Sequence, residues 1–403
     1  MNSISVIIPY YNNADTITGA LASVYAQTLP PAEIIVVDDA SATPFADTPA
    51  AGGIPTHCIR LETNRGPAGA RNAGIAAAQG EWIAFLDADD EWLPSKLEQQ
   101  MALIAEHPDA GLVAASAAAA DETIDLRPQT LDLKEIGLKS NYRESGVGSP
   151  RFAFRATQGK RESSPSGSMP AQQNAGLPGL KSKVYGLWSN LPLRDFAVEN
   201  PVITSTVLVR KALIEAVGGF DEQFRGPEDY DLWVRIASAA AASAAANAAA
   251  DETTDCRPQT ADLKENGVQG AEGFSQESGV GRRESSQQVY SLRSAVYSLN
   301  TPLIRYRTRS GSLSMDDRTF LPQVLRVLDK VYGEGGALAA LKCYERHARA
   351  HQYAGASWMA FCRGARARAL YLLLRSCAWQ PWMATGKRWK LMARYLVGEW
   401  GSV

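Results

Sequence analysis

The chain has 403 residues and a mass of 43.4 kDa, enough for roughly two to three domains and a sizeable core. Its 41 Lys and Arg residues nearly balance its 43 Asp and Glu residues, which argues against a nucleic-acid-binding protein with a broad basic surface. A hydrophobic share of 45% argues against wholesale disorder, and no run of ~20 apolar residues predicts a transmembrane helix.

Strands and helices are predicted to alternate along the first part of the chain. Apolar runs predict strands at 5–8, 33–37, 57–61 and 81–86, and helical spacing of apolar residues predicts helices at 13–27, 68–79 and 94–106. This alternation favours a mostly parallel sheet, in which ligands bind beyond the carboxyl ends of the strands. Polar clusters follow three of the strands, at 10–13, 38–39 and 87–90.

The most acidic of these clusters holds Asp87, Asp89 and Asp90 within four residues. Such close carboxylates repel one another and resist joint ionisation, and a divalent cation removes that conflict. Oxygen ligands suit Mg²⁺ or Mn²⁺, usually shared with substrate phosphates. The alternative is an acidic turn that only precedes the helix near Pro94, but the position at a strand end favours a metal site.

Two further segments carry candidate functional residues. The segment 64–72 is a glycine-containing loop that enters a helix, whose free N–H groups can bind an anion, although a plain loop–helix junction is equally compatible. The segment 226–233 begins a helix with the adjacent acids Glu228 and Asp229. Acids at a helix start are also favoured by the helix dipole alone.

The cysteines and the N-terminus indicate the compartment. Five cysteines are present, an odd number, and none forms a CxxC pair, so a reducing compartment is favoured over a disulfide framework. The apolar run 4–11 follows no basic residue and ends at Asn12 and Asn13, unlike a signal peptide. We therefore expect a cytoplasmic protein.

Two segments of the chain are near copies of each other. Residues 121–137 and 251–267 agree at 13 of 17 positions, and each follows an Ala-rich tract. The copies are polar and lack apolar periodicity, so each is interpreted as a surface insertion or a disordered loop rather than a stacked repeat. Because loop-closure entropy costs only ~0.6 kcal/mol per doubling of length, a host domain can tolerate both insertions.

Five segments together resemble a known family. They lie at 7–12, 36–41, 64–72, 85–90 and 226–233, and their order and spacing resemble the inverting GT-A glycosyltransferases of family 2 over roughly 1–115 and 184–236. The resemblance implies an α/β fold of the GT-A type, Rossmann-like, with a mostly parallel central sheet flanked by helices and a C-terminal helical region.

This resemblance divides the chain into six parts. Residues 1–118 are expected to form the nucleotide-sugar-binding half of the GT-A domain, 184–244 the acceptor-side half with the catalytic base, and 289–320 its end. The two low-complexity insertions are placed at 119–183 and 245–288, and basic helices with tryptophans at 321–403.

The resemblance also implies a nucleotide-diphospho-sugar donor, most simply a UDP-sugar, and Mn²⁺ or Mg²⁺ as cofactor. By analogy Asp89 is the more direct metal ligand, with Asp87 beside it at the donor. The remaining donor-binding residues implied by the family pattern are Pro9, Tyr11, Asp39, Asn64, Gly66 and Arg71.

Asp229 matches the catalytic base of the family, with Glu228 as the adjacent alternative. The implied reaction is one in-line displacement by a hydroxyl of a glycan or lipid-linked acceptor, as in surface polysaccharide or lipo-oligosaccharide synthesis. One departure is Arg309, which stands where many relatives carry a His; Arg cannot ligate a metal but can pair with a diphosphate.

The C-terminal part of the chain is basic. From 337 to 396 it has eleven Lys and Arg residues, one acid and four tryptophans, a pattern typical of peripheral contact with the inner face of a membrane. The alternative is a helical bundle packed on the catalytic domain. Two alternatives to the transferase also stay open: a glycosyltransferase-like protein inactivated by its insertions, and a sugar-phosphate nucleotidyltransferase, which wants a glycine-rich loop after the first strand.

Overall fold

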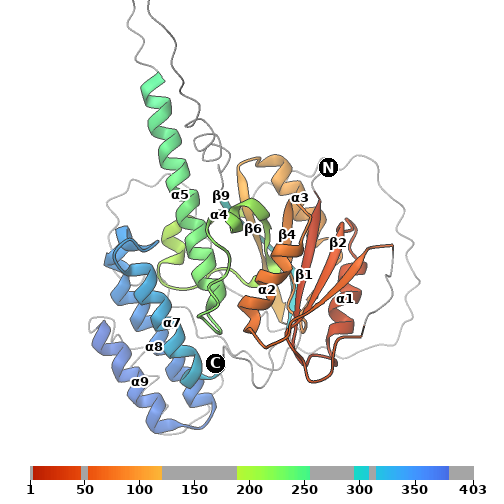
Figure 1. The fold of residues 1–403 in the computed structure, drawn as a ribbon. Helices are drawn as coiled ribbons and strands as arrows, with labels where there is room; N and C mark the ends of the chain where they lie inside the picture. The colour runs from red at the N-terminus through yellow and green to blue at the C-terminus, as the bar shows by residue number, and fades with distance from the viewer. Residues whose placement is uncertain (1–2, 47–52, 120–187, 255–294, 308–314, 381–403) are drawn as a thin grey trace, which may run out of the picture.

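The computed structural model describes residues 3–46, 53–119, 188–254, 295–307 and 315–380. Most of both predicted insertions, the segment with Arg309 and the last residues of the chain therefore lie outside the described residues. Within the described part, a sheet flanked by helices is followed by a group of C-terminal helices (Figure 1).

One mixed sheet holds the strands of the described residues in the order β3-β2-β1-β4-β8-β6-β9-β5, with β7 paired to β9. Strands β3, β2, β1 and β4 run parallel, whereas β8 is antiparallel to both β4 and β6. The strands are β1 Ile4–Tyr10, β2 Glu33–Asp38, β3 Thr56–Arg60, β4 Trp82–Phe85, β5 Glu91–Trp92, β6 Ala110–Ala119, β7 Trp188–Asn190, β8 Leu208–Arg210 and β9 Ala295–Tyr306. The predicted α/β fold class is confirmed.

Helices cover both faces of the sheet and form the C-terminal region. The α-helices are α1 Ile17–Tyr25, α2 Gly66–Ala77, α3 Lys96–Glu106, α4 Lys211–Ala216, α5 Glu228–Thr254, α7 Asp317–Tyr332, α8 Glu345–Cys362 and α9 Arg366–Trp379. The 3-10 turns are η2 Leu193–Phe196, η3 Thr204–Thr206 and η5 Ala339–Tyr344.

Strand β1 separates two hydrophobic cores, because successive side chains of a strand point to opposite faces. Ile7 lies in the cluster with α2 and α5, whereas Val6 and Ile8 lie in the cluster with α1 and α3. Packing on the first face uses Gly74 of α2, where a Cβ would come within 2.5 Å of Cγ2 of Ile7. The continuous apolar strands are thus buried on both faces, as expected for parallel strands.

Helix α5 differs from the sequence-based division of the chain. The second insertion was placed at 245–288, but α5 continues across that position to Thr254. Its second half is the Ala-rich tract, and alanine has the highest intrinsic helix propensity, which explains why the helix does not end at 244. The insertion boundaries themselves stay predictions.

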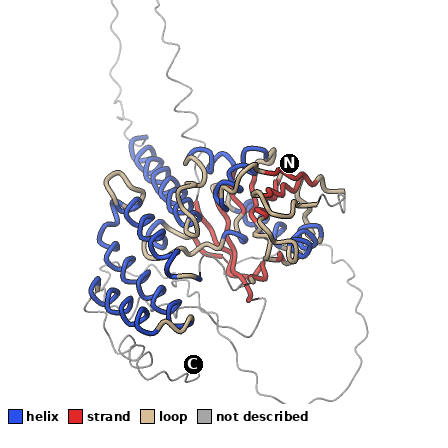
Figure 2. The backbone as a smooth tube through the Cα atoms, turned by 60° about the horizontal axis from the view of Figure 1, so that its bottom comes forward, coloured by secondary structure: helices blue, strands red, loops and turns tan. Residues whose placement is uncertain are grey.

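The helices α7, α8 and α9 pack on the sheet domain as a bundle (Figure 2). Their buried side chains belong to the same hydrophobic cluster as α5, and Trp358 and Trp379 are partly buried against it. The guanidinium of Arg349 also lies 5.3 Å from the ring centroid of Trp379. These two tryptophans therefore serve the packing of the bundle.

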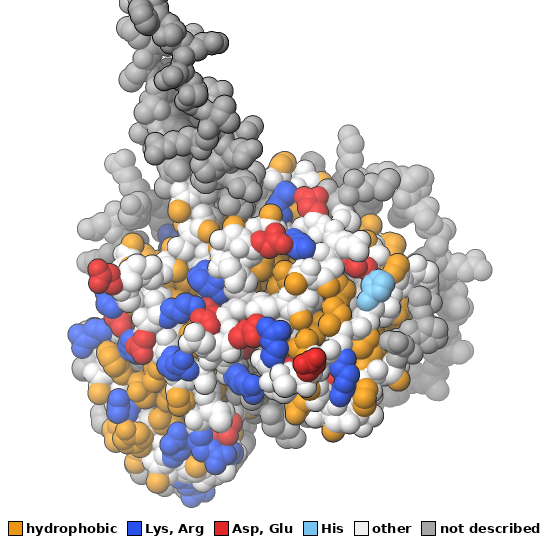
Figure 3. All heavy atoms as spheres, viewed as in Figure 1, with side chains coloured by type: hydrophobic (Ala, Val, Ile, Leu, Met, Phe, Trp, Pro, Cys, Tyr) orange, Lys and Arg blue, Asp and Glu red, His pale blue; other side chains and the backbone are white. Residues whose placement is uncertain are grey.

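The outer surface of the bundle mixes hydrophobic and basic side chains (Figure 3). Tyr371 and Leu374 of α9 are 53% and 52% exposed. Among the described residues, no helix is both long and apolar enough to cross a membrane.

Candidate active site

The polar strand ends that the sequence singles out lie at one edge of the sheet. Tyr10 at the end of β1 pairs with Asp38 at the end of β2, and Ile7 of β1 pairs with Phe85, two residues before Asp87. Since these strands are parallel, their carboxyl ends open on the same side. The predicted convergence of the three polar clusters is therefore present.

Asp39 organises the loop that enters α2. Its Oδ1 accepts a hydrogen bond from the Arg65 N–H at 2.7 Å and its Oδ2 from the Gly66 N–H at 2.8 Å. The side-chain amide of Asn64 donates to the Asp39 carbonyl at 3.2 Å, and Gly66 has a positive φ of 74° that favours glycine. Three predicted donor-binding residues, Asp39, Asn64 and Gly66, are thus brought together in one unit.

Asp38, next to it, is occupied by structural contacts. It is fully buried, pairs with Arg60 and accepts from the backbone N–H groups of Ser41 and Phe45. Burial alone would raise the pKa of its carboxyl, but these hydrogen bonds hold the pKa below its ordinary value. Asp38 therefore fixes the loop after β2.

Pro9 and Tyr11 lie beside this loop at the end of β1. Pro9 is half-buried, and Tyr11 is 50% exposed. Asn12 joins the loop after β1 to the loop after β2, because its N–H donates to Ser41 Oγ at 3.0 Å and its Oδ1 accepts from Ala42 at 2.9 Å. An exposed aromatic ring is thus held at the rim of the candidate donor site.

The acidic turn after β4 separates one buried acid from two accessible ones. Asp90 is 1% exposed; its Oδ2 accepts from Ser205 Oγ at 2.6 Å and its Oδ1 from the Arg307 N–H at 3.0 Å. Burial first, then the charge of Asp87, raises the pKa of Asp90 to about 8. Asp87 and Asp89 are only half-buried.

Asp87 and Asp89 fit a Mg²⁺ or Mn²⁺ ion by the chemistry of their donor atoms. The described residues contain no cluster of three His, Cys, Asp or Glu side chains that would hold an ion alone. Both ions commonly use one or two carboxylates and take their other ligands from water and substrate phosphates. The two accessible carboxylates beyond β4 match that pattern.

Arg71 joins the acidic turn to the start of α5. Its guanidinium, in a side chain 6% exposed, donates to Asp87 Oδ1 at 2.7 Å and to Glu228 Oε1 at 2.9 Å. Burial by itself lowers the pKa of a guanidinium, but the charges of Asp87 and Glu228 raise the pKa of Arg71 above its ordinary value. Arg71 is therefore a permanent positive charge between two candidate functional segments.

Glu228 and Asp229 have different surroundings. Glu228 is 4% exposed, and besides Arg71 it accepts from the Gly226 N–H at 2.6 Å. Asp229 is only partly buried, and its Oδ2 accepts from Asn200 Nδ2 at 3.1 Å and Thr204 Oγ1 at 3.0 Å. Of the two acids, Asp229 is therefore the more exposed residue.

The pKa of Asp229 is raised to about 7. Loss of hydration is the largest cause and the charge of Glu228 the second, while Arg71 and the hydrogen bond from Thr204 act in the opposite direction. Although part of the residue surface is accessible, the carboxylate lies deep among protein atoms. A carboxyl with a pKa near neutrality is suited to accept a proton.

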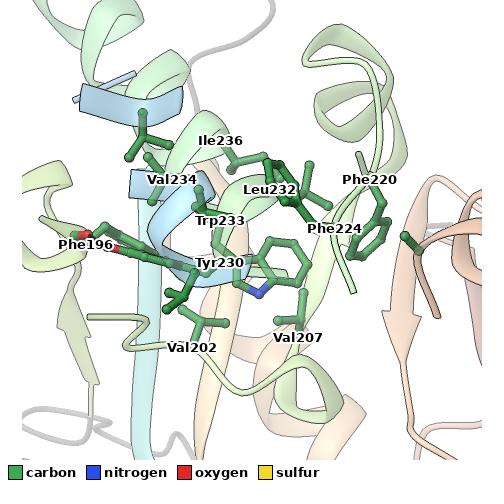
Figure 4. Close-up of a cluster of buried hydrophobic side chains, with 14 of the residues drawn as sticks. Phe196, Val202, Val207, Phe220, Phe224, Tyr230, Leu232, Trp233, Val234 and Ile236 are labelled. Carbon is green, nitrogen blue, oxygen red and sulfur yellow. Dashed lines mark hydrogen bonds between the residues drawn. The ribbon is translucent and has the colours of Figure 1, made fainter. Parts of the chain in front are cut away.

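The start of α5 is held in place by a cluster of apolar side chains (Figure 4). The Trp233 ring lies 6.2 Å from the ring of Phe85 in β4 and 5.9 Å from that of Phe220. Tyr230 donates its hydroxyl to the Phe196 carbonyl at 2.8 Å. The contact of Trp233 with Phe85 of β4 and the bridge from Glu228 through Arg71 to Asp87 thus fix α5 relative to the acidic turn.

Sequence reasoning missed several residues of this site, namely Asn200, Thr204, Ser205 and Tyr306. Burial, then the charges of Asp90, Asp87, Asp89 and Asp229, raises the pKa of the Tyr306 phenol. Single Thr, Ser or Asn residues carry no spacing signal, and only the folded contacts bring them to the site.

Residues 5–163 match the family model described as Glycosyl transferase family 2. This match confirms the resemblance to glycosyltransferase family 2 over these residues.

Two curated relatives show the extent of the similarity. The chain is 46% identical over 102 residues to the succinoglycan biosynthesis protein ExoO of Rhizobium meliloti (strain 1021), covering 24% of this chain and 28% of that protein. It is 38% identical over 111 residues to the UDP-Glc:alpha-D-GlcNAc-diphosphoundecaprenol beta-1,3-glucosyltransferase WfgD of Escherichia coli, covering 25% and 40%. The chain thus aligns with less than half the length of either relative.

Among solved structures, Staphylococcus aureus TarS 1-349 in complex with UDP-GlcNAc aligns with 99% of this chain and 93% of that chain. The TM-score is 0.45 and the sequence identity 14%.

Proposed function

We propose that this chain is an inverting, metal-dependent glycosyltransferase that moves one sugar from a UDP-sugar to a hydroxyl of a glycan or lipid-linked acceptor. The observation that carries the proposal is the pair of segments joined by Arg71: an accessible base, Asp229, on one side and the accessible acids Asp87 and Asp89 on the other. The family 2 domain and the names of its relatives support the reaction class and a role in surface polysaccharide or lipo-oligosaccharide synthesis.

Asp229 acts as the general base in this proposal. The acceptor oxygen attacks the anomeric carbon, the bond from that carbon to the diphosphate oxygen breaks, and the hydroxyl proton passes to Asp229. The hydrogen bonds from Asn200 and Thr204 orient its carboxylate, and its raised pKa favours proton uptake. Inversion follows from this single displacement.

The donor is proposed to lie over the carboxyl ends of β1, β2 and β4. Tyr11 offers an exposed ring at its rim, and the Asp39 carboxylate fixes the Asn64–Gly66 loop beside it. Asp89 and Asp87 would hold Mn²⁺ or Mg²⁺, which when bound neutralises charge on the leaving diphosphate. The Arg71 charge next to Asp87 adds to the positive potential at this position.

The acceptor is proposed to be presented at the inner face of the cell membrane, with α9 as the contact. Its exposed Tyr371 and Leu374 lie among the basic side chains Arg366 and Arg375. By its name, the E. coli relative acts on a diphosphoundecaprenol-linked sugar. Co-sedimentation with anionic phosphatidylglycerol vesicles should fall at least about fivefold in the double variant Tyr371→Ser, Leu374→Ser; binding that is unchanged by the substitutions would exclude this surface.

Calorimetry of donor binding tests the transferase proposal. Purified protein is titrated with UDP-, GDP- and dTDP-sugars, with and without Mn²⁺. Binding of UDP-sugars that needs Mn²⁺ and is lost in Asp89→Ala is the expected result. A folded protein that binds none of these donors would instead favour a glycosyltransferase-like protein without activity.

A further inference from the structure

A three-residue turn lies between the candidate base and the acidic turn. This turn, η3, consists of Thr204, Ser205 and Thr206, which are 4%, 0% and 0% exposed. It connects the loop after η2 to strand β8, which pairs antiparallel with β4. Nothing in the sequence pattern marks these small polar residues as functional.

Thr204 contacts the base. Its Oγ1 donates to Asp229 Oδ2 at 3.0 Å, the same oxygen that accepts from Asn200 at 3.1 Å. The two donors fix the rotation of the carboxylate, because its other oxygen accepts from the Tyr230 N–H at 2.6 Å. A hydroxyl donor stabilises the ionised carboxylate, the form that can accept a proton.

Ser205 makes two hydrogen bonds to the acidic turn and one to β5. Its Oγ donates to Asp90 Oδ2 at 2.6 Å and accepts from the Asp87 N–H at 3.1 Å. Its carbonyl accepts from Trp92 Nε1 at 2.8 Å. The backbone of Asp87, one of the candidate metal-binding acids, is therefore tied directly to the residue next to Thr204.

Buried groups behind η3 support it. Gln100 Nε2 donates to the Thr206 carbonyl at 2.7 Å, and Lys96 Nζ donates to Gln100 Oε1 at 2.8 Å. Lys96 is fully buried, and its ammonium lies 4.1 Å from the Trp92 ring centroid. The turn η3 is thus hydrogen-bonded to the buried Gln100 as well as to Asp229 and to the acidic turn.

We propose that Thr204 and Ser205 are positioning residues: Thr204 orients and ionises Asp229, and Ser205 holds the acidic turn, so that η3 sets the separation between the base and the diphosphate site. This inference rests on the proposed transferase function. It assigns to η3 the alignment of the candidate base with the candidate diphosphate site.

Thr206 provides a matched control. Its hydroxyl is equally buried but donates to the Ile203 carbonyl at 2.7 Å and faces neither acid. Thr204→Val and Thr206→Val each remove one buried hydroxyl from the same turn without changing the shape of the side chain. A difference in stability or turnover between the two variants therefore reports the hydrogen bond from Thr204 to Asp229 and not a general loss of packing.

The pH dependence of stability tests the Thr204 contact without a substrate. Glu228 on the same helix and Arg71 on α2 shift the pKa of Asp229, and the charge of Asp229 in turn raises the pKa of the Tyr306 phenol on β9. An acid whose pKa is raised in the folded state stabilises the protein below its unfolded pKa and loses that contribution as the pH rises through the folded pKa. Loss of the Thr204 hydroxyl should raise this pKa by about one further unit.

We therefore expect the Tm of Thr204→Val to fall below that of Thr206→Val by about 3 °C at pH 8.5, and the gap to close at pH 5. Thr204→Ser, which keeps the hydroxyl, should follow the wild type. A gap that does not change with pH overturns the role of Thr204.

Measurements of turnover and donor binding test the proposed effect of Thr204 and Ser205 on function. Nucleoside diphosphate release from the bound donor should fall about fivefold at pH 7 in Thr204→Val, with an unchanged donor KM, and should recover toward pH 8.5. Ser205→Ala should instead weaken Mn²⁺-dependent donor binding about tenfold in calorimetry. Thr206→Val should change neither turnover nor Mn²⁺-dependent donor binding.

The two possible failures are distinguishable. If the wild type binds no donor, the proposed function fails and this inference with it. If the wild type binds and turns over a donor but Thr204→Val and Ser205→Ala behave like Thr206→Val, only the positioning role is overturned.

Discussion

At the scale of single residues, the two acids that begin α5 differ in their charged partner and in their exposure. Glu228 is held by Arg71 and the Gly226 N–H, whereas Asp229 stays accessible. Asp229→Asn should therefore lower turnover at least ~100-fold while donor binding stays nearly unchanged, because the amide cannot accept the proton. Steady-state kinetics beside donor calorimetry measure this, with Asp329→Asn, a largely exposed acid of α7, as the control.

Unchanged turnover in Asp229→Asn would remove this residue from the role of base. Equal losses in turnover and in donor affinity would instead indicate a damaged site.

The raised pKa of Asp229 also predicts a pH profile. Burial and Glu228 raise this pKa to about 7, so the ionised base is lost as the pH falls below that value. The rate constant kcat/KM should fall about tenfold per pH unit on the acid side of about 7. A profile that stays flat down to pH 5 would contradict Asp229 as the group that takes the proton.

Arg71 shows a second residue-scale effect, since it is the buried partner of two acids from distant parts of the chain. Arg71→Met should destabilise the fold by roughly 3–5 kcal/mol, because a buried Glu228 loses its compensating charge. Arg65→Met breaks a pair with Glu222 that is exposed, and should cost less than ~1 kcal/mol. Urea unfolding at pH 7 measures the free energy of unfolding of both variants. Similar losses in Arg71→Met and Arg65→Met would show that the pairing of Arg71 with Glu228 does not stabilise the fold.

Sequence reasoning singled out Asp87 and Asp89 because they lie in a cluster of carboxylates at a strand end, and the family resemblance added Asp229 at a helix start. It did not reach the bridge through Arg71, whose partner Glu228 lies 157 residues away. Nor did it reach Thr204 and Ser205, since the position of a lone hydroxyl is set by the fold and not by its neighbours in the chain.

At the scale of elements, the parallel strands β1 to β4 are all predicted from the sequence, and β1, β2 and β4 are buried on both faces. β1, β2 and β4 are continuous apolar runs, and their local pattern alone specifies them. The short strand β8 has three residues and pairs antiparallel with β4 and β6, so its existence depends on distant partners. Helix α5 exceeds its expected end because alanine propensity continues it.

The contact between α2 and β1 gives a prediction at the element scale. Gly74→Ala places a Cβ within 2.5 Å of Ile7, so α2 must move away from the sheet at a cost of ~1–3 kcal/mol. Gly355→Ala in α8 meets no atom within 4 Å and should instead stabilise the protein by ~0.5–1 kcal/mol. Thermal unfolding of the two variants measures whether each substitution lowers or raises the stability. Stabilisation by Gly74→Ala would mean that the α2–β1 packing is looser than described.

At the scale of the whole molecule, the described residues on either side of segment 120–187, which contains most of the first predicted insertion, pair with the same strand. Ala119 at the end of β6 pairs with Tyr306 of β9, and Trp188 at the start of β7 pairs with Leu299 of the same strand. Seven residues of extended strand separate these two partners, roughly 23 Å at about 3.3 Å per residue. A flexible linker of about 12 residues can span that separation.

Replacing residues 120–187 by such a Gly/Ser linker should therefore leave the fold intact. Shortening the connection between β6 and β7 from 68 to about 12 residues lowers the entropy cost of closing that connection by only ~1.5 kcal/mol. The replacement also removes no strand pairing of the described sheet. We expect a Tm equal to or slightly above that of the full chain and unchanged Mn²⁺-dependent donor binding. A shortened protein that unfolds at a clearly lower temperature would show that this segment contributes packing to the domain. Retained stability with lost donor binding would place part of the donor or acceptor site within it.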